Sequence, residues 1–144
     1  EKSARTFVEI DGRRWALPGD MATVDADGTI HLVGRGSLCI NTGGEKVYPD
    51  EVEAVLKNHP AIADAVVVGV PDDRWGQRVV AVVSQAVPSR APTLDDVRTY
   101  CRARLAGYKA PSELCVVDEV QRSPAGKPDY AWAREVAGAA DGSP

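Results

Sequence analysis

The sequence predicts an α+β fold in which a short β-hairpin segment is followed by a small α/β sandwich. Two near-continuous runs of β-branched residues, 62–70 and 79–87, indicate a pair of buried strands. Apolar residues spaced three and four apart in 49–57 and 94–105 indicate amphipathic helices. Short extended pieces separated by glycine-containing turns fill the first third of the chain, which is typical of β-hairpins.

The first third contains two predicted hairpins. Its extended pieces are residues 13–17, 21–24, 29–33, 38–41 and 45–48. The turn of the first hairpin ends at Gly28, which can take the positive φ that a tight turn needs. The turn of the second contains Gly43 and Gly44. Paired glycines allow a tight turn and let another group approach the backbone closely.

Beyond residue 48 the predicted chain continues with helices and strands. The predicted elements are helices at 49–57, 94–105 and 128–136 and strands at 62–70, 79–87 and 114–120. Pro49 suits a first helical turn, and Thr93 is a favourable N-cap for the second helix. Together these elements predict a two-stranded hairpin plus a roughly three-stranded mixed sheet with three helices.

Composition excludes several classes of protein. The chain has 144 residues, of which 44% are hydrophobic, and a formal net charge of -4. Because no clustered basic face is present, nucleic acid is not expected as a partner. The longest apolar run, 61–70, is too short to cross a bilayer, so we expect no transmembrane segment and a cytoplasmic protein.

The cysteines and histidines form no metal or catalytic-triad pattern. Cys39, Cys101 and Cys115 lack the paired spacing of a zinc site or a disulfide framework, and are expected to be reduced, mostly buried thiols. His31 and His59 have no partner at ligand spacing. We therefore expect no metal site in this chain.

Two short segments carry groups suited to nucleotide chemistry. Asp20 follows Gly19 and can accept two hydrogen bonds from ribose hydroxyls, although an ordinary turn aspartate is the alternative. Lys127 lies in a glycine-proline turn, from which an ammonium group can stabilise charge that develops in a transition state. A turn lysine is more often a solvated surface group. The segment is not a phosphate loop, because Pro128 replaces the required hydroxyl residue.

Eight short motifs, in order, resemble the C-terminal part of the adenylate-forming enzymes, the acyl-CoA synthetases. They are Gly19-Asp20, Asp27-Gly28, Gly34-Arg35, Thr42-Gly43-Gly44-Glu45, Tyr48-Pro49-x-Glu51-Val52-Glu53, Gly69-Val70-Pro71-Asp72-x-x-Trp75-Gly76, Tyr108-Lys109-x-Pro111 and Pro124-x-Gly126-Lys127. Each motif is weak alone, but the ordered set spans nearly the whole chain. The variants at 36–47 and 125–130 look most like actinobacterial fatty-acid CoA ligases, including a branch that acts on sterol side-chain acids.

The resemblance implies a two-step ligase. A carboxylate and ATP, with Mg, would form an acyl-adenylate and pyrophosphate, and the CoA thiol would then displace AMP to give a thioester. In that family a small C-terminal domain caps a large N-terminal domain and rotates between the steps. The implied acid is a fatty or other hydrophobic carboxylate, and ATP with Mg would be bound mainly by the N-terminal domain. A homodimer is left open.

The same resemblance divides the chain into parts. Residues 1–35 would be the terminal strands of the large domain, 36–37 the hinge, 38–140 the C-terminal cap and 141–144 a tail. The N-terminal adenylation domain is then a partner in the same protein. This chain is expected to be a fragment that does not catalyse the full reaction alone.

The resemblance also assigns roles to individual residues. The expected site residues are Lys127 for catalysis of adenylation, Asp20 and Arg35 for the nucleotide, Gly43, Gly44, Trp75 and Tyr108 for CoA, and Ser37 for the hinge. A side chain at the glycine turn would block an approaching thiol. For Trp75 and Tyr108, simple packing at a domain rim is the equally weighted alternative.

Two positions depart from the family pattern. Ser37 stands where Asp or Lys is common, and a small polar residue can still absorb the φ/ψ change of a hinge. Tyr130 stands where Arg is frequent, which removes one charge contact. Two other functions stay open: a fatty acyl-AMP ligase that loads a carrier protein, and a non-catalytic nucleotide- or CoA-binding module.

Overall fold

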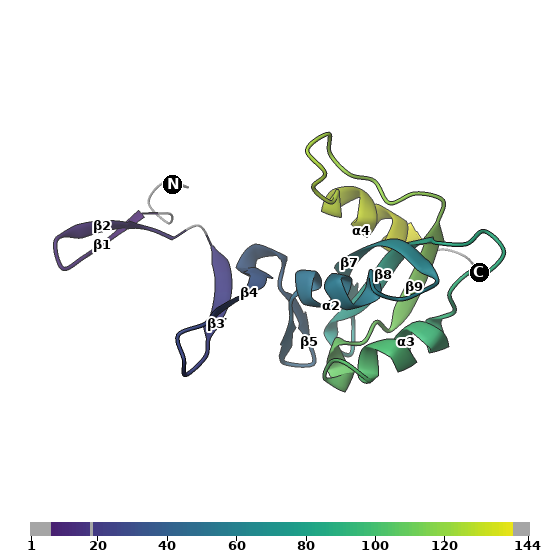
Figure 1. The fold of residues 1–144 in the computed structure, drawn as a ribbon, viewed down its shortest axis with the longest axis horizontal. Coiled ribbons are helices and arrows are strands. Elements are labelled where there is room, and N and C mark those ends of the chain that lie inside the picture. The colour runs from purple at the N-terminus through teal and green to yellow at the C-terminus, as the bar shows by residue number, and fades with distance from the viewer. Residues whose placement is uncertain (1–6, 18, 140–144) are drawn as a thin grey trace.

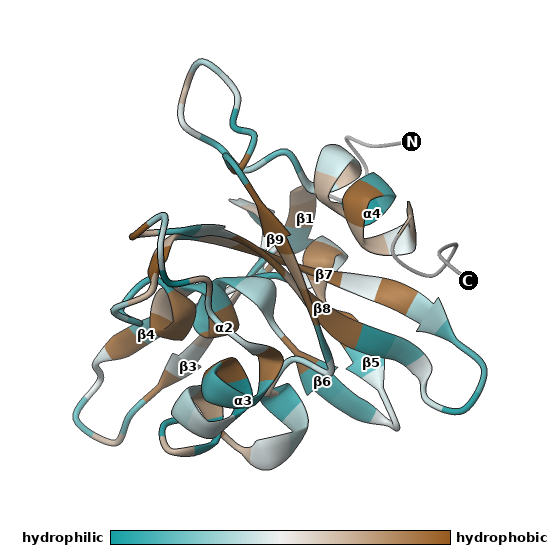
Figure 2. Ribbon diagram, turned by 90° about the vertical axis from the view of Figure 1, so that its right-hand side faces the viewer, coloured by the Kyte–Doolittle hydropathy of each residue, from teal (hydrophilic) through white to brown (hydrophobic). Residues whose placement is uncertain are grey.

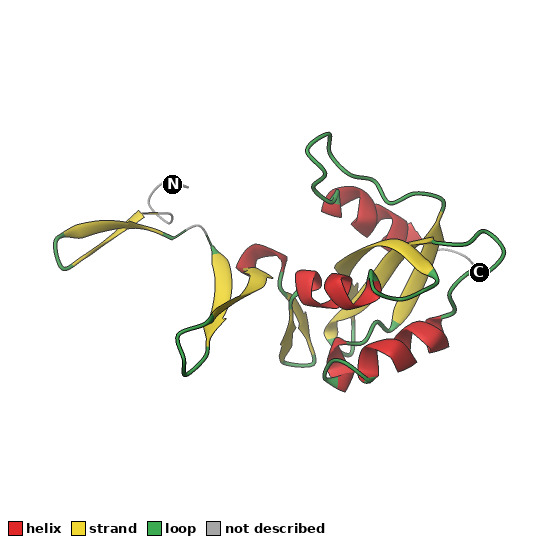
Figure 3. Ribbon diagram, viewed as in Figure 1, coloured by secondary structure: helices red, strands yellow, loops and turns green. Residues whose placement is uncertain are grey.

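Two antiparallel β-hairpins begin the described chain. The computed structural model describes residues 7–17 and 19–139, and Figures 1 and 3 show its elements. Strand β1 (Phe7–Ile10) pairs with β2 (Arg13–Ala16), and β3 (Asp20–Val24) pairs with β4 (Ile30–Arg35). The predicted tail at 141–144 lies outside the described residues, as do residues 1–6 of the predicted first segment.

Strand β1 is absent from the sequence prediction, although an Asp-Gly turn marks its end. Asp11 and Gly12 have φ values of 52° and 70°, which is the pair of positive angles that a tight hairpin turn requires. The other predicted strands of this region agree with β2, β3 and β4 to within two residues.

The N-terminal segment exposes large apolar side chains. They are Phe7, Ile10, Trp15, Leu17, Met21, Val24, Ile30 and Leu32. In Figure 1 the hairpin of β1 and β2 extends away from the helices and the larger sheet, and the hairpin of β3 and β4 meets them only at the end of β4, so the rest of the chain leaves this apolar surface exposed. Apolar surface gathered in this way marks a contact with another protein or domain.

A five-stranded mixed sheet forms the centre of the remaining chain. Strands β7 (Ile62–Asp72) and β8 (Gly76–Gln85) form a long antiparallel pair. The other edge of β8 is shared by β5 (Ile40–Thr42), through the pair Thr42 and Gly76, and by the parallel strand β9 (Glu113–Val117). Strand β6 (Glu45–Val47) pairs with β5 and ends the sheet. The predicted hairpin and three-stranded sheet are therefore continuous.

Three α-helices complete the predicted fold class, which the structure confirms. They are α2 (Pro49–Leu56), α3 (Leu94–Arg102) and α4 (Tyr130–Ala139), and the short 3-10 helices η1 (Gly36–Leu38) and η2 (Gly107–Lys109) precede β5 and β9. At the start of α3, the Thr93 hydroxyl accepts a hydrogen bond from the backbone N–H of Asp96, as an N-cap does. Within the described residues, no helix is long and apolar enough to cross a bilayer.

The core lies on both faces of the β7–β8 pair. Alternate residues of a strand point to opposite faces, so both faces become buried when helices cover each of them. On one face Val67 packs in a cluster with Leu56 of α2 and Val97 of α3, and on the other Val66 packs with Ala133 of α4. Figure 2 shows the hydrophobic colouring concentrated on the strands between the helices. This double burial explains the unbroken apolar runs in the sequence.

The turn between β7 and β8 is shorter than predicted. The sequence predicts a turn over 71–77, whereas the strands continue until Asp72 pairs with Gly76. Oδ1 of Asp72 accepts hydrogen bonds from the backbone N–H groups of Arg74 at 3.0 Å and Trp75 at 2.8 Å. Because this carboxylate satisfies the turn donors locally, the remaining residues stay in the ladder.

The three cysteines are free thiols at different depths. Cys101 is buried in the cluster beneath α3, whereas Cys39 and Cys115 are only half-buried. Burial raises the pKa of the Cys101 thiol, although the charge of Arg104 opposes this shift. Cys101 therefore behaves as a small apolar core residue.

Replacement of Leu56 by alanine tests how much this core contributes to the stability of the fold. Leu56 is fully buried between α2 and the sheet. We expect Leu56→Ala to lower the free energy of unfolding by about 2–5 kcal/mol, measured by urea denaturation of the 144-residue chain. Leu32→Ala is the matched control, because Leu32 is 79% exposed and its loss should change the value by less than about 0.5 kcal/mol. Equal losses would contradict the core assignment.

Candidate functional site

A first cavity of about 600 Å³ lies where the β3–β4 hairpin, η1 and the loop before α4 come together. The predicted site residues on its wall are Asp20, Arg35, Ser37 and Lys127. Asp20 and Arg35 lie opposite each other in β3 and β4, with Arg35 Nε 3.5 Å from Asp20 Oδ1. Residues more than 100 positions apart in the sequence thus share one cavity.

The wall of the first cavity depends on a glycine. Gly34 has a φ of 131°, and a Cβ atom at this position would collide with the carboxylate of Asp50. Asp50 lies in the first turn of α2, where the helix dipole favours a negative charge. Glycine at position 34 therefore lets β4 lie directly against the N-terminus of α2.

A closed loop, residues 122–128, presents Lys127. The backbone N–H of Ser123 donates to the carbonyl oxygen of Lys127 at 2.8 Å, and that of Gly126 donates to the carbonyl oxygen of Ser123 at 2.8 Å. Gly126 has a φ of 77°, which favours glycine at this turn. Lys127 itself is exposed and lines the first cavity. The loop thus brings an ammonium group to a cavity that also holds a carboxylate and a guanidinium group.

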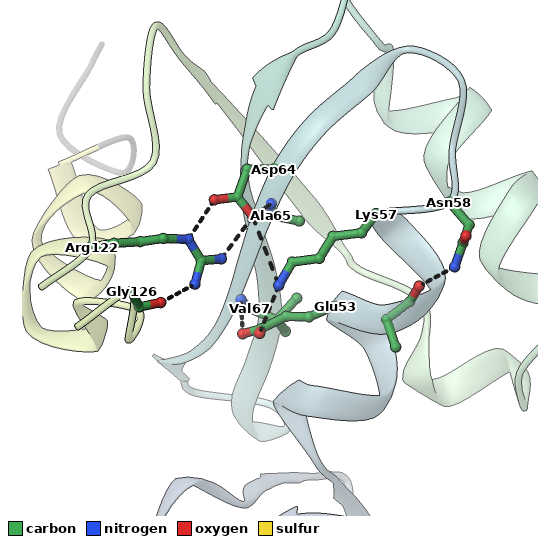
Figure 4. A network of polar contacts seen from close by, with 9 residues as sticks. Glu53, Lys57, Asn58, Asp64, Ala65, Val67, Arg122 and Gly126 are labelled. Atoms are coloured by element: carbon green, nitrogen blue, oxygen red, sulfur yellow. Dashed lines mark hydrogen bonds and ion pairs between the residues drawn. The ribbon is translucent and has the colours of Figure 1, made fainter. Parts of the chain in front are cut away.

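A polar network joins this loop to β7 and α2 (Figure 4). The guanidinium of Arg122 donates from Nε to Asp64 Oδ2 at 2.6 Å and from Nη2 to Asp64 Oδ1 at 2.7 Å. Lys57 Nζ lies 3.8 Å from Asp64 Oδ1 and 3.9 Å from Glu53 Oε2. Glu53 Oε1 in turn accepts a hydrogen bond from the backbone N–H of Val67 at 2.9 Å. The charges therefore alternate from the loop to the helix.

Burial raises the pKa of two groups close to the first cavity. It raises the pKa of the Glu53 carboxyl, although the hydrogen bond from Val67 and the charge of Lys57 oppose this. Burial also raises the pKa of the Tyr130 hydroxyl, and the charges of Glu53 and Asp50 raise it further. Tyr130 therefore presents a neutral hydroxyl side chain to the cavity.

A second cavity, of about 420 Å³, lies at the Asp72 end of the β7–β8 pair. Three of the four residues predicted to bind CoA line it: Gly43, Trp75 and Tyr108. Trp75 is 49% exposed and Tyr108 is 44% exposed, so neither ring is packed into the core. Gly44, the fourth predicted residue, is not among those that line the cavity.

The two glycines of the turn have different surroundings. The backbone N–H of Gly43 donates to the carbonyl oxygen of Trp75 at 2.9 Å, and a Cβ atom at Gly43 would lie 2.9 Å from Cε3 of Trp75. Gly44 has a φ of 88°, but a Cβ atom there would meet nothing within 4 Å. Gly43, with a φ of 58°, is therefore required both by its backbone conformation and by a close contact, whereas Gly44 is required by its backbone conformation alone.

Two ion pairs near the second cavity were not predicted from the sequence. Arg78 lines the cavity and donates from Nε to Glu113 Oε2 at 2.9 Å, which joins β8 to β9. Lys109 Nζ lies 2.7 Å from both carboxylate oxygens of Glu51 and so ties η2, which carries Tyr108, to α2. Glu51 and Lys109 both belong to motifs recognised in the sequence, but those motifs do not indicate that the two residues meet.

The magnesium that accompanies ATP does not fit the described residues. Within 7–17 and 19–139, no group of three His, Cys, Asp or Glu side chains is placed to hold a metal ion. In the first cavity, Asp20 is already paired with Arg35, whose positive charge opposes a cation there. We assign no magnesium ligand in this chain.

The described residues form a small domain built on a helix-covered mixed sheet, preceded by hairpins with uncovered apolar faces. Comparison with known families identifies the domain. The chain belongs to the family of AMP-binding enzyme C-terminal domains, whose model matches residues 51–127, more than half of the chain.

Curated relatives are much longer than this chain. A medium/long-chain-fatty-acid–CoA/3-oxocholest-4-en-26-oate–CoA ligase from Mycobacterium tuberculosis is 59% identical over 135 residues, which are 94% of this chain and 24% of that protein. A fatty acid–[acyl-carrier-protein] ligase, ScoC, from Streptomyces coeruleorubidus is 43% identical over 127 residues, 88% of this chain and 24% of that protein. The chain thus spans about a quarter of the length of these relatives.

Solved structures show the same fold. The o-succinylbenzoate CoA synthetase MenE from Bacillus subtilis, in complex with the acyl-adenylate intermediate OSB-AMP, matches with a TM-score of 0.77 and 34% identity. The match covers 88% of this chain and 25% of that chain. Most of this fold therefore occurs in a protein whose structure was solved with an acyl-adenylate.

Alanine at each glycine of the turn tests the difference between Gly43 and Gly44. Both residues have positive φ, so each substitution should lower the free energy of unfolding by about 1–2 kcal/mol. Only Gly43→Ala should shift the NMR resonance of the Trp75 indole N–H, because only its Cβ meets that ring. A matching shift in Gly44→Ala would contradict the contact.

Acid unfolding tests the pair formed by Asp64 and Arg122. Partial burial acts to raise the pKa of Asp64, but the hydrogen bonds from Arg122 and the backbone of Ala65 outweigh it and hold the pKa below its ordinary value of 3.8. The pair therefore stabilises the fold above that pH, and this contribution is lost as the pH falls through the lowered pKa. We expect Asp64→Asn to be less stable at neutral pH and less sensitive to pH below about 4, in thermal melts across that range. An unchanged acid profile would contradict this pairing.

Proposed function

We propose that this chain is the C-terminal domain of an ATP-dependent carboxylic acid:CoA ligase. In the first step a carboxylate oxygen attacks the α-phosphorus of ATP, the bond to pyrophosphate breaks, and an acyl-adenylate forms. In the second step the CoA sulfur attacks the acyl carbon, AMP leaves, and the thiol proton is released. The observation that carries the proposal is the gathering of Asp20, Arg35 and Lys127 in one cavity, apart from the cavity of Gly43, Trp75 and Tyr108.

The first cavity suits the adenylation step. The Asp20 carboxylate accepts hydrogen bonds from the ribose hydroxyls, and Arg35, which already pairs with Asp20, lies beside the ribose and phosphates. Lys127 places its ammonium group where negative charge develops between the carboxylate and the α-phosphate. One well-placed donor of this kind contributes about 3–4 kcal/mol to the stability of a transition state.

The second cavity suits the thioester step. At the glycine turn, Trp75 packs against Gly43, and the open space beside Gly44 lets a pantetheine arm approach the backbone. The exposed faces of Trp75 and Tyr108 offer stacking surfaces for an adenine base. Ion pairs hold both sides of this cavity, since Arg78 binds Glu113 and Lys109 ties η2 to α2.

A rotation about the segment that contains Ser37 would bring first one cavity and then the other to the reacting acyl group. Ser37 lies in η1, between the end of β4 and the start of β5, and lines the first cavity. In this proposal 1–35 belong to an N-terminal adenylation domain, 36–37 are the hinge and 38–140 are the cap. The uncovered apolar faces of the two hairpins fit packing against the rest of that domain.

A fatty or other hydrophobic acid is the proposed substrate. The relative from Mycobacterium tuberculosis is a ligase of medium- and long-chain fatty acids and of 3-oxocholest-4-en-26-oate, and this chain is 59% identical to it. The more distant carrier-protein ligase, at 43% identity, favours CoA as the acceptor by comparison. ATP with Mg would be held mainly by the N-terminal domain.

Lys127→Ala in the intact enzyme tests the proposed function. Acid-dependent release of pyrophosphate should fall at least about a hundred-fold, because the ammonium group that stabilises the adenylation transition state is lost. Formation of the thioester from supplied acyl-adenylate and CoA should stay within about twofold of the wild-type rate.

Gly43→Ala is the reciprocal control, and it should slow the thioester step while leaving pyrophosphate release largely intact. Equal damage to both half-reactions by Lys127→Ala would argue against the assigned role. A wild-type enzyme that transfers the acyl group to a carrier protein but not to free CoA would make the acceptor a carrier protein.

A further inference from the structure

The side chain of Lys127 makes no contact that fixes its position. Within the described residues its ammonium group has no hydrogen bond or ion pair, and only its backbone is held, by the Ser123 hydroxyl at 3.2 Å and by the Ser123 N–H at 2.8 Å. A lysine has a long and flexible side chain. The direction in which it leaves the protein must therefore be set by the loop that carries it.

Arg122, the first residue of this loop, makes three hydrogen bonds, two to the sheet and one within the loop. The two bonds to the sheet are the paired bonds to Asp64, at 2.6 Å and 2.7 Å, and Asp64 lies near the start of β7. The third runs from Nη1 to the carbonyl oxygen of Gly126, at 2.9 Å. Figure 4 shows the guanidinium of Arg122 between Asp64 and Gly126. Gly126 directly precedes Lys127 in the sequence, so one planar group connects the sheet to the peptide that carries the lysine.

The surroundings of Asp64 keep this attachment charged and oriented. Asp64 Oδ1 also accepts a hydrogen bond from the backbone N–H of Ala65 at 2.9 Å, and Lys57 lies 3.8 Å away. The hydrogen bond with Asp64 raises the pKa of Arg122. The side chains of Arg122 and Asp64 are only 26% and 27% exposed, so water competes less for these bonds than at an open surface.

Only arginine has the shape for this arrangement. Its guanidinium offers five donors in a fixed fork, which can bind a carboxylate with one edge and a carbonyl oxygen with another. The single ammonium of a lysine cannot hold the same three oxygens in the same plane. The substitution Arg122→Lys therefore keeps the charge and removes the geometry.

We propose that Arg122 and Asp64 are positioning residues that aim Lys127 at the α-phosphate during adenylation. Neither residue lines the first or the second cavity, and the pair reaches the first one only through the loop that carries Lys127, so its loss should affect the first half-reaction. This inference rests on the proposed function. It adds that the efficiency of the lysine depends on a bond between two residues that are 58 positions apart in the sequence.

Arg122→Lys in the intact enzyme, assayed for each half-reaction, tests the inference. We expect kcat for acid-dependent pyrophosphate release to fall about ten- to a hundred-fold, as misplacement of a catalytic group by an ångström does. The KM for ATP and the rate of thioester formation from supplied acyl-adenylate should stay within about twofold of wild type. Hydrogen exchange at the backbone N–H groups of 123–127 should become faster while the core strands keep their protection.

Two further variants complete the experiment. Asp64→Asn should weaken pyrophosphate release in the same selective way, and it decides the question if Arg122→Lys does not fold. Arg104→Lys is the matched control, because Arg104 packs over Tyr100 on α3 and lines neither cavity, so both half-reactions should keep their wild-type rates.

Equal loss of both half-reactions would make the Arg122 and Asp64 pair merely structural and overturn the inference, as would full pyrophosphate release in Arg122→Lys. Failure of the proposed function would show itself separately, since the wild-type enzyme would then release no pyrophosphate.

Discussion

The antiparallel pairing of β7 with β8 is the constraint on which the rest of the structure depends. Because helices cover both of its faces, the middle of the pair is buried and its side chains are fixed by packing. The remaining edge of β8 then accepts β5 at one end and β9 further along. The glycine turn follows β5, which pairs with β8, and the lysine loop is attached to β7 through Asp64. The positions of both cavities therefore depend on β7 and β8.

The elements that depend on local pattern could be predicted from the sequence. Pro49 and Thr93 begin helices where expected, and the two apolar runs are strands. Strand β1 was missed because its four residues carry little pattern, although Asp11 and Gly12 mark the turn that follows it. The end of β7 was misplaced because a single carboxylate, that of Asp72, satisfies the turn donors, and composition does not reveal such a bond.

Site residues carried by short motifs were found, whereas pairs between distant residues were not. Asp20, Arg35 and Lys127 do share a cavity, as do Gly43, Trp75 and Tyr108, while the roles given to them stay predictions. The bonds that hold the two sites, Arg122 with Asp64 and Lys109 with Glu51, each span 58 residues. The pattern of residues along the sequence does not indicate contacts between residues so far apart, because such contacts form only when the sheet brings the two segments together.

The length of β7 has a consequence for the order of events in the proposed ligase. Asp64 holds the lysine loop and Asp72 lines the second cavity, and the eight residue steps from Asp64 to Asp72 extend about 26 Å along a strand. A strand of that length, packed on both faces, cannot bend so far that both of its ends reach one acyl group. In the proposed ligase, the two ends of the cap would therefore engage the acyl group one after the other, and the thiol could not attack until the cap had turned.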